Sequence, residues 1–397
     1  MRLVLAGAGH VHIKTLENLK EFTRRGWSVD VVSPAPFHYY SGMGPGLLGG
    51  DYGPEEVRFP VREMTESRNC SFREDRLVAI EADSNRLRLE SGATLNYDLL
   101  SCNLGSHVNA EGLEISSEVP EDFFFPVKPI ENLYEAHKRL LELPIRGSGG
   151  VLIVGGGPAA VEIAGNSIEL LSRRSRESGS EAPSVCLCAG GEFLRHFPER
   201  LRKICRRSLE SRGAGIRRGY ISKILPTGVE CADGSRMEAS MVILATGVKP
   251  PAWLRDTGIA LGDDGGILVN EHLQSVSHPN IFAGGDCLSF KPTPIRRVGV
   301  HAVRQAPVLL ENLLAFVEGR GTGARGRTVS GAESPGARRS GLPGRFSPQN
   351  QFLLILNLGG GRGVAAKWGT TFDGRLAFKL KDRIDRQFVG SVRPDGG

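Results

Sequence analysis

The sequence contains few cysteines, and none of them is placed in a recognisable pairing pattern. The seven cysteines among 397 residues are an odd number, scattered along the chain, without CxxC or zinc-type spacing. This usage argues against a disulfide-stabilised secreted domain and gives no indication of a metal site. We expect mostly inert core thiols in a reducing cytosol, including Cys186 and Cys188, which alternate along one predicted strand.

Long apolar runs and an evenly spread charge are also absent. No apolar stretch approaches the roughly 18 residues that a membrane span needs, and the chain opens on a glycine-rich loop instead of a signal peptide. The formal net charge of +6 is mainly local, because Glu318 to Arg345 contains six arginines and two glutamates. We therefore expect a cytoplasmic protein without a nucleic-acid partner.

Glycine is abundant, and one glycine-rich turn stands near the middle of the chain. Val151 to Val154 is an apolar run that predicts a buried strand. Gly155 and Gly157 follow as a tight turn, Pro158 takes the first helical position, and Ala160 takes the third place of a GxGxxG/A fingerprint. Such a turn lets the backbone approach a pyrophosphate, which the amides at the helix N-terminus then bind. The order strand, glycine turn, helix predicts a dinucleotide-binding unit.

A second unit of this kind opens the chain. Leu3 to Ala6 is an apolar strand, Gly7 and Gly9 match the fingerprint, and a helix is expected over residues 13–22. After the next strand, Ser33 stands where an acidic residue usually binds a ribose hydroxyl. The other features fit, so we expect Gly7, Gly9 and Ser33 to contact a first dinucleotide.

Two histidines and an aromatic segment accompany the first fingerprint. His12 stands where a third small residue is usual, and His10 lies in the same turn. We expect both beside the phosphates; the alternative is that they carry protons. Residues 33–53 are rich in glycine, proline and aromatics, which are costly to expose, so we expect this loop, with Ser41 and Gly42, near the same cofactor.

The remaining elements alternate between strands and helices. Three segments between residues 77 and 100 predict an antiparallel meander, and a polar linker is expected over residues 172–180. A strand over residues 184–188 ends in two glycines, with neither an acid for the ribose of NADH nor an arginine for the 2′-phosphate of NADPH, so the choice of nucleotide stays open. Other predicted elements are a helix over 131–143, strands over 241–245 and 281–283, a helix over 302–316, a hairpin over 352–356 and 363–368, and a terminal helix.

The order of four motifs resembles the two-dinucleotide-binding-domain flavoproteins of the pyridine nucleotide-disulfide oxidoreductase superfamily. These motifs are the fingerprints at Gly7 and Gly155, then Ala245-Thr246-Gly247, then Gly284-Gly285-Asp286. The segments YYSGMGPGLLGG, FPVKPI, GVHAVRQAP and KDRIDRQF are most similar to type II NADH dehydrogenase-like proteins, in particular those associated with selenide, water dikinase. No kinase domain accompanies them here, and both ribose-binding acids are missing from their usual places.

The resemblance implies an α/β fold with two Rossmann-like domains. The NAD(P)H-binding domain (148–245) would be nested within an FAD-binding domain (1–147 and 246–318), followed by a C-terminal hairpin and amphipathic helix (346–397). Residues 319–345, rich in glycine, serine and arginine, are expected to be a disordered insertion. FAD would bind at the first fingerprint and NADH or NADPH at the second. The oligomeric state stays open.

The resemblance also implies roles for individual residues. Asp286, with Gly285 and Gly247 nearby, would hold the flavin, and Lys128 and Gln305 would border its ring system. Glu162 would steady the nicotinamide, and His301 could pass a proton to a reduced quinone. The alternatives are a surface glutamate, a helix-capping lysine and a core histidine.

The absence of a thiol pair near the first fingerprint indicates what kind of electron acceptor the protein uses. Disulfide reductases of this superfamily need a Cys-x₄-Cys pair against the flavin, and residues 37–50 contain no cysteine. We therefore expect an FAD-dependent NAD(P)H oxidoreductase that delivers electrons to a diffusible acceptor, with a quinone implied by the resemblance. The rivals are a sulfide:quinone-type enzyme using Cys102 and Cys287, a selenium- or sulfur-compound reductase, and a flavin-binding regulatory protein.

The terminal helix has an apolar stripe and a basic face. Leu376, Leu380, Ile384 and Phe388 recur every four residues, and cations cover the other face. This pattern predicts either contact with a bilayer interface, on the inner face of the membrane, or packing on the flavin domain.

Overall fold

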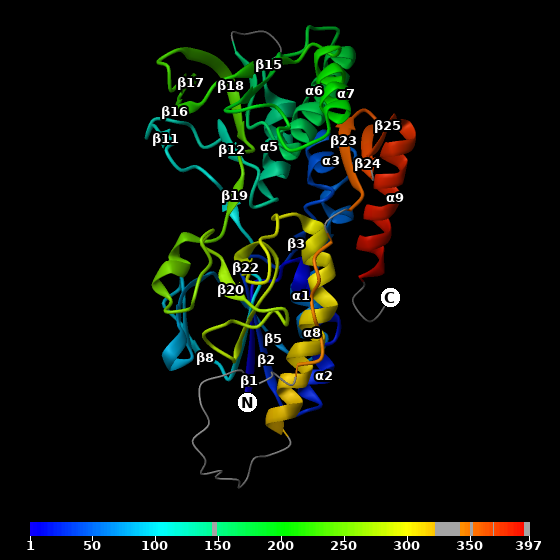
Figure 1. Cartoon of the computed structure of the whole chain (residues 1–397). Coiled ribbons are helices and arrows are strands. Elements are labelled where there is room, and N and C mark those ends of the chain that lie inside the picture. Colours follow the sequence, from blue (N-terminus) through cyan, green and yellow to red (C-terminus); the bar gives the residue numbers. More distant parts are fainter. Residues whose placement is uncertain (145–148, 322–341, 350–351, 368, 393–397) are drawn as a thin grey trace.

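The computed structural model describes residues 1–144, 149–321, 342–349, 352–367 and 369–392. Two lobes, each built on its own sheet, lie one above the other, and the C-terminal elements run along one side (Figure 1). Most of the expected insertion, residues 322–341, lies outside the described residues. Among the residues described, no helix is both long and apolar enough to cross a membrane.

The first lobe contains a five-stranded sheet with the order β21-β9-β1-β2-β5, in which all neighbours are parallel. Leu3 to Ala6 are fully buried, as expected of a parallel strand covered on both faces. Helix α8 packs against α1 beside this sheet. The strands are β1 (Arg2–Ala6), β2 (Ser28–Ser33), β5 (Ser71–Glu74), β9 (Leu99–Cys102) and β21 (Ile281–Ala283), and the helices are α1 (His10–Glu17), α2 (Leu19–Thr23), α4 (Val61–Glu66) and α8 (Gly299–Gly321).

Local details of this lobe differ from the sequence prediction. The helix expected over 13–22 is two helices, because the side chain of Asn18 bonds to the Lys14 carbonyl and interrupts the helix. The expected loop over 33–53 contains a strand and a buried helix, and the last meander segment divides between β8 and β9. The elements are β3 (His38–Tyr39), β4 (Arg58–Phe59), β6 (Leu77–Glu81), β7 (Arg86–Leu89), β8 (Thr94–Asn96), β20 (Ile267–Val269) and β22 (Leu288–Phe290), with 3₁₀ turns at Pro54–Glu56, Ala82–Ser84, Ala252–Asp256 and Gly285–Cys287. The buried helix from the expected loop, α3 (Gly44–Gly49), packs instead against two helices of the second lobe, α5 (Asn132–Glu142) and α6 (Pro158–Ser178).

The second lobe is built on a mixed sheet with the order β11-β16-β17-β18-β13-β14-β15, and β12 also pairs with β18. β13, β14 and β15 are parallel, whereas β16, β17 and β18 form an antiparallel meander. The elements are β11 (Glu114–Ile115), β12 (Phe124–Pro126), α5 (Asn132–Glu142), β13 (Gly150–Val154), α6 (Pro158–Ser178), β14 (Val185–Ala189), α7 (Glu199–Glu210), β15 (Gly215–Arg218), β16 (Ile221–Leu225), β17 (Gly228–Cys231) and β18 (Arg236–Leu244).

Two features of the second lobe differ from the sequence prediction. β11 and β12 belong to its sheet although they precede the expected boundary at residue 148. The expected polar linker over 172–180 is mostly helix, because α6 continues to Ser178. The two connections between the lobes pair with each other as β10 (His107–Val108) and β19 (Val248–Lys249).

The C-terminal part contains three strands where a hairpin was predicted. These are β23 (Leu354–Gly359), β24 (Arg362–Lys367) and β25 (Thr370–Gly374), followed by α9 (Arg375–Ser391). β23 crosses α6 so closely that a Cβ on Gly165 would overlap the Leu358 carbonyl. The expected limits of the insertion also shift, since α8 continues to Gly321 and Gly344 is bound to the buried side chain of Asn312.

Candidate functional site

The first glycine turn is closed by the backbone that follows the neighbouring strand. Gly7 has a φ of +84°, and a Cβ built on it would overlap the carbonyl oxygen of Asn103, directly after β9. A Cβ on Gly9 would overlap the Asn103 side chain. Because glycine alone fits here without strain, the turn places the N-terminus of α1 above the carboxyl ends of β1 and β9, where ligands of such sheets bind.

Asn103 also connects the turn to the Gly284-Gly285-Asp286 motif. Its Oδ1 accepts a hydrogen bond from the Val11 N–H at 3.1 Å, and its Nδ2 donates to the Gly284 carbonyl at 2.8 Å. The sequence analysis missed this residue. The position of Asn103 directly after an apolar strand suggests a site at the edge of the sheet, but an asparagine side chain at that position does not predict which groups it binds.

The two histidines of the first turn have different surroundings. His10 is the first residue of α1, and its Nδ1 lies 2.9 Å from Nε2 of His38. His12 is fully buried, with Nε2 2.8 Å from Ser101 Oγ and Nδ1 2.5 Å from the Gly7 carbonyl oxygen. Burial lowers the pKa of His12 to about 4. Its expected place beside the phosphates is therefore corrected: the ring fills space between α1 and β9.

Lys128 and Asp286 come together at the edge of this turn. The Lys128 Nζ lies 2.5 Å from Asp286 Oδ2, and Ser106 Oγ donates to the same oxygen at 2.7 Å. Burial alone would raise the pKa of Asp286, but the Lys128 charge and the two hydrogen bonds hold it below its usual value. An ionised carboxylate therefore stands at the carboxyl end of β21.

Gln305 and His301 lie on the first turns of α8 and border the same motif. The buried Gln305 accepts a hydrogen bond from the Gly285 N–H at 2.7 Å and so fixes the turn before Asp286. His301 is also buried, and its Nδ1 has no hydrogen-bond partner among the residues that the structure describes. Burial, and then the charge of Arg304, lowers the pKa of His301.

The second glycine turn repeats the construction of the first. Gly155 has a φ of +148°, and a Cβ on it would overlap the Ala245 carbonyl, directly after β18. Pro158 begins α6, and Ala160 is fully buried beneath the turn. By contrast, a Cβ on Gly157 would meet no atom within 4 Å, and the same holds for Gly247. The backbone is therefore open to a ligand at this end of α6.

Glu162 points away from the second turn toward the C-terminal elements. Its Oε1 accepts a hydrogen bond from the Asn357 N–H in β23 at 2.8 Å. Burial raises the pKa of Glu162 to about 7, although the nearby charge of Lys381 acts in the opposite direction. A carboxyl with this pKa changes its protonation near neutral pH, which is the property required of a proton carrier.

Lys381 joins Glu162 to the segment before α3. Its Nζ donates to the Gly42 carbonyl at 2.6 Å and to Asp385 Oδ2 at 2.7 Å, one turn along α9. Tyr40 OH donates to the other oxygen of Asp385 at 3.2 Å. The sequence pattern placed Lys381 among the cations on the basic face of the terminal helix and predicted no role for Asp385.

The other predicted residues lie near the two turns. Ser33 ends β2 and is buried, and the residues Ser41 and Gly42 lie between β3 and α3. The structure thus brings the first-turn residues together with Lys128, His301, Gln305 and Asp286, whereas Glu162 faces a separate network.

Cys102 and Cys287 do not form an accessible pair. Both side chains are fully buried in the core of the first lobe, where the Cys287 thiol donates weakly to the Cys102 carbonyl at 3.5 Å. Burial raises the pKa of Cys287 to about 11 and that of Cys102 well above its ordinary value. Neither thiol meets the requirement for a reactive thiolate, which must be accessible and ionised to attack a disulfide.

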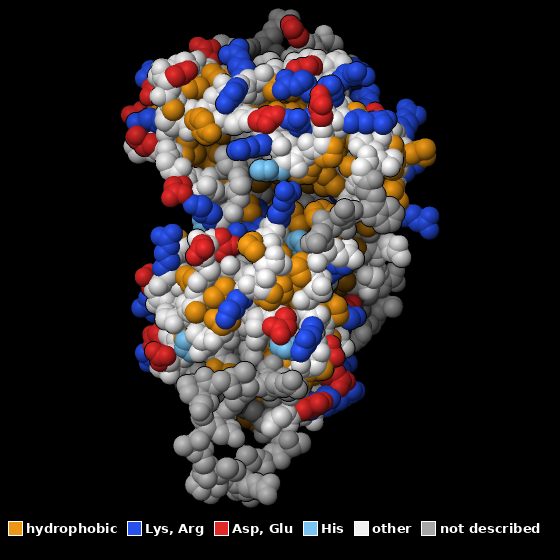
Figure 2. All heavy atoms as spheres, viewed as in Figure 1, with side chains coloured by type: hydrophobic (Ala, Val, Ile, Leu, Met, Phe, Trp, Pro, Cys, Tyr) orange, Lys and Arg blue, Asp and Glu red, His pale blue; other side chains and the backbone are white. Residues whose placement is uncertain are grey.

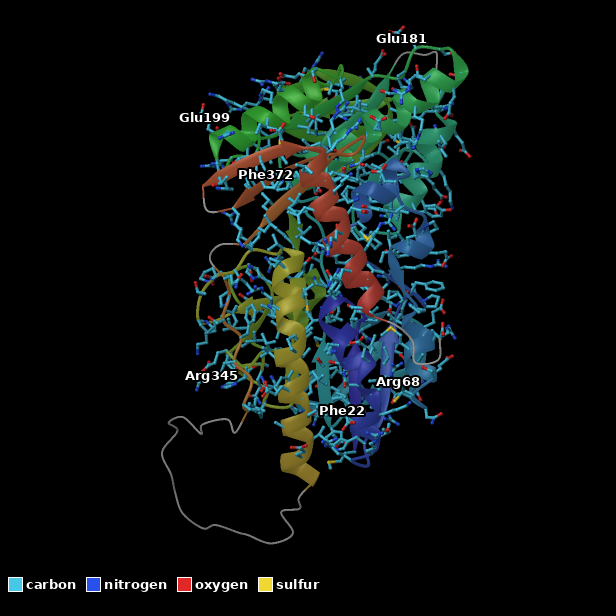
Figure 3. All side chains as sticks on the ribbon, turned by 90° about the vertical axis from the view of Figure 1, so that its right-hand side faces the viewer. Phe22, Arg68, Glu181, Glu199, Arg345 and Phe372 are labelled. Atoms are coloured by element: carbon cyan, nitrogen blue, oxygen red, sulfur yellow. The ribbon has the colours of Figure 1, made fainter. Side chains whose placement is uncertain are left out.

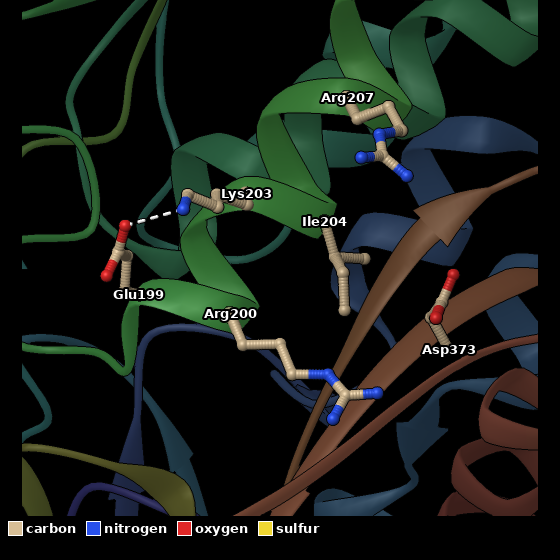
Figure 4. Close-up of a pocket in the computed structure, with 6 residues that line it drawn as sticks. All are labelled: Glu199, Arg200, Lys203, Ile204, Arg207 and Asp373. Carbon is tan, nitrogen blue, oxygen red and sulfur yellow. Dashed lines mark ion pairs between the residues drawn. The ribbon is translucent and has the colours of Figure 1, made fainter.

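An open pocket lies elsewhere, between α7 and β25 (Figure 4). Arg200 and Arg207 line it, and neither forms an ion pair with another residue that the structure describes; Lys203 is paired with Glu199. Asp373 contributes a carboxylate from β25. The pocket belongs to the face that carries α9 and not to either glycine turn.

Comparisons with known proteins give a family and a fold. A family model described as pyridine nucleotide-disulphide oxidoreductase matches residues 1–306. Ferroptosis suppressor protein 1 of Taeniopygia guttata is 29% identical over 258 residues, covering 62% of this chain and 63% of that protein. An internal alternative NAD(P)H-ubiquinone oxidoreductase A1 of Arabidopsis thaliana is 27% identical over 142 residues, covering 35% and 28%. The chain thus spans less than two thirds of both relatives.

Two solved structures share the fold. The sulfide:quinone oxidoreductase from Aquifex aeolicus has a TM-score of 0.75 at 18% identity, covering 99% of this chain and 91% of that one. The structure of NDH2 from Plasmodium falciparum in complex with NADH has a TM-score of 0.76 at 13% identity, covering 98% and 97%. The predicted α/β fold with two dinucleotide-binding domains is confirmed.

Replacing Glu162 with Gln tests the environment of its carboxyl group. The pKa of about 7 in the folded protein exceeds the ordinary value of 4.5, so the parent loses stability as the pH rises through this interval. The free energy of unfolding of Glu162→Gln, relative to the parent, should therefore increase by about 1–3 kcal/mol between about pH 5 and pH 8. Urea denaturation of both proteins at each pH measures this difference in the free energy of unfolding. The matched control is Glu177→Gln, exposed at the end of α6; an equal increase in the control would contradict the prediction.

Proposed function

Since the chain belongs to the pyridine nucleotide-disulphide oxidoreductase family, we propose that it is an FAD-dependent enzyme that passes electrons from NADH or NADPH to a diffusible quinone. The observation that carries this proposal is the pair of glycine turns, built alike at the carboxyl ends of parallel strands in two sheets. A relative named NAD(P)H-ubiquinone oxidoreductase and the fold shared with NDH2 in complex with NADH support it.

The first turn fits FAD. Gly7 and Gly9 let the turn close against Asn103, and the N-terminus of α1 that this turn places over the strand ends presents a positive dipole end to a pyrophosphate. Asp286 would accept hydrogen bonds from ribityl hydroxyls, with Lys128 neutralising its charge. Bound FAD would supply the redox chemistry, namely acceptance of a hydride from the nicotinamide and transfer of two electrons to the acceptor.

The second turn fits the nicotinamide nucleotide. Gly157 and Gly247 leave the backbone open, and Pro158 begins α6 with its N-terminus directed at the opening. Glu192, the carboxylate nearest the end of β14, is paired with Arg202, so no free acid marks the ribose site and the proposal includes both NADH and NADPH.

Reduction of a quinone needs a proton donor, and the group of side chains around Glu162 is the candidate. Oxidation of NAD(P)H releases a hydride, and reduction of a quinone to a quinol consumes that hydride equivalent plus one further proton. Lys381 and Glu162 would hold and deliver this proton beside the Ser41–Gly42 segment, with Asp385 and Tyr40 fixing the lysine. His301 is the alternative donor, but burial and then the charge of Arg304 lower its pKa, which disfavours the protonated ring.

The acceptor would reach the protein from a membrane surface. The stripe was predicted either to contact a bilayer or to pack on the flavin domain: Leu376, Leu380 and Ile384 are exposed, whereas Phe388 packs against Tyr40. Lys379 and Arg383 lie on the same side of α9 as the exposed part. Figure 3 looks onto this face, with Phe372 near the upper end of α9, and Figure 2 shows Lys and Arg side chains gathered over the upper lobe. Apolar and basic side chains together suit an interfacial helix. The exposed apolar residues are Phe372 (42%), Leu376 (76%), Leu380 (36%) and Ile384 (43%).

Anaerobic stopped-flow mixing tests the catalytic proposal. The parent should lose the visible absorption of its flavin on mixing with NADH or NADPH and regain it on mixing with a water-soluble quinone. Lys381→Met should leave the first step unchanged and slow the second by about a hundredfold, because a positioned proton donor contributes at least that much.

Lys138→Met, an exposed lysine on α5, is the matched control and should behave as the parent in both steps. A parent flavin that neither nucleotide reduces would refute the oxidoreductase function. An unchanged second step in Lys381→Met would instead refute only the proton route.

Vesicle flotation tests the membrane contact. The parent should float with vesicles that contain anionic phospholipid, and a variant carrying Leu376→Glu, Leu380→Glu and Ile384→Glu should remain in the soluble fraction, because charged side chains do not enter the interface. Leu141→Glu changes a leucine of similar exposure (43%) on α5 and should float as the parent does. Failure of the parent to float, or equal flotation of the triple variant, would contradict the proposal.

A further inference from the structure

Two histidines from distant parts of the chain form a pair beside the first glycine turn. His10 begins α1 and His38 begins β3. Nε2 of His38 lies 2.9 Å from Nδ1 of His10, and the rings meet edge to face with centroids 4.7 Å apart. His38 stacks on Phe59, and Tyr40 packs against His10. Both rings are therefore held in fixed orientations.

The second nitrogen of His10 has no partner in the described protein. Its Nε2 is buried and makes no hydrogen bond, although such a group is costly to bury unsatisfied. The charged groups near it are Lys128 and Asp286, which belong to the proposed FAD site. An unsatisfied nitrogen at the end of a glycine turn, beside those two residues, indicates a ligand atom in this space.

The histidine pair determines which hydrogen bond His10 can make. Burial, and then the charge of Lys128, lowers the pKa of His10 to about 4, and burial lowers the pKa of His38 as well. Both rings are thus neutral, and each carries one N–H. Between them one nitrogen must donate and the other accept, so the proton on one ring fixes the tautomer of the other.

We propose that His38 donates from Nε2 to Nδ1 of His10, and that His10 donates from Nε2 to an oxygen of FAD. This inference rests on the proposed function and deepens it. His10 is a cofactor-binding residue, and His38 is a positioning residue that acts through the tautomer of His10. The oxygens of FAD at this place, phosphate or ribityl, would accept hydrogen bonds. The electropositive N-terminus of α1 favours an anionic phosphate there, and a phosphate oxygen accepts a hydrogen bond from such an N–H.

The test measures FAD affinity directly, by titrating the deflavinated protein with FAD and following quenching of flavin fluorescence. Gln places its amide nitrogen where His has Nε2, whereas Leu has no donor and Asn places its amide where His has Nδ1. His10→Leu, His10→Asn and His38→Leu should each weaken FAD binding by roughly tenfold or more. His10→Gln and His38→Gln should bind within a few-fold of the parent.

Thermal unfolding of each apoprotein shows whether the variant folds. If the leucine variants do not fold, the comparison of His10→Asn with His10→Gln still decides the question. His107→Leu, an exposed histidine in β10, is the control and should bind FAD as the parent does. Equal affinity of His10→Asn and His10→Gln, or parental affinity in His38→Leu, would overturn the inference. Because affinity is measured without turnover, that outcome would leave the proposed reaction intact, whereas a parent that takes up no FAD would refute both.

Discussion

The structure depends on the absence of a Cβ atom at two equivalent positions. At Gly7 and at Gly155, a side chain would collide with the carbonyl of the residue that follows the neighbouring parallel strand, Asn103 in one lobe and Ala245 in the other. The collision is with backbone, so no side-chain movement could relieve it. Each sheet can therefore place a helix N-terminus directly over its own carboxyl edge, and the two openings that result are the sites proposed for the two dinucleotides.

The C-terminal helix α9 is the second element on which the proposed site depends, and its two sides have different surroundings. Its inner side carries Lys381 and Asp385 into the segment that precedes α3, where a lysine and a carboxylate can be buried because they are paired. Its outer side exposes leucine and isoleucine to solvent. In this account one helix both completes the proton route and brings the site to a membrane surface, so the acceptor would arrive where the proton is available.

The sequence was sufficient for whatever depends on local pattern. The two strand–turn–helix units follow from glycine spacing and apolar runs, whereas the family and the two-domain fold came from the resemblance of four motifs in order; the comparisons confirm the family and the fold. The assignments of Gly155 and Pro158 to a turn and a helix start needed only short-range chemistry. The structure places both where the pattern predicted.

Residues that act through distant partners could not be predicted in this way. Asn103 connects two motifs that are far apart in the chain, and Lys381 reads as a surface cation because the alternation along α9 does not reveal which side faces the protein. His12 was misplaced for a related reason: the fingerprint predicts its backbone, but the direction of its ring is set by Ser101 on a strand 89 residues away. The apolar residues of the exposed stripe on α9 recur at the same spacing as those of a buried helix face, so the sequence pattern does not distinguish the two.

The central claim, that the two turns hold two different nucleotides, is tested most directly by filling each turn separately. Gly7→Val should give a folded protein that is purified without FAD, whereas Gly155→Val should retain FAD that neither NADH nor NADPH reduces under anaerobic conditions. A Gly155→Val protein that loses FAD while Gly7→Val keeps it, or FAD that is reduced normally in both, would contradict the account.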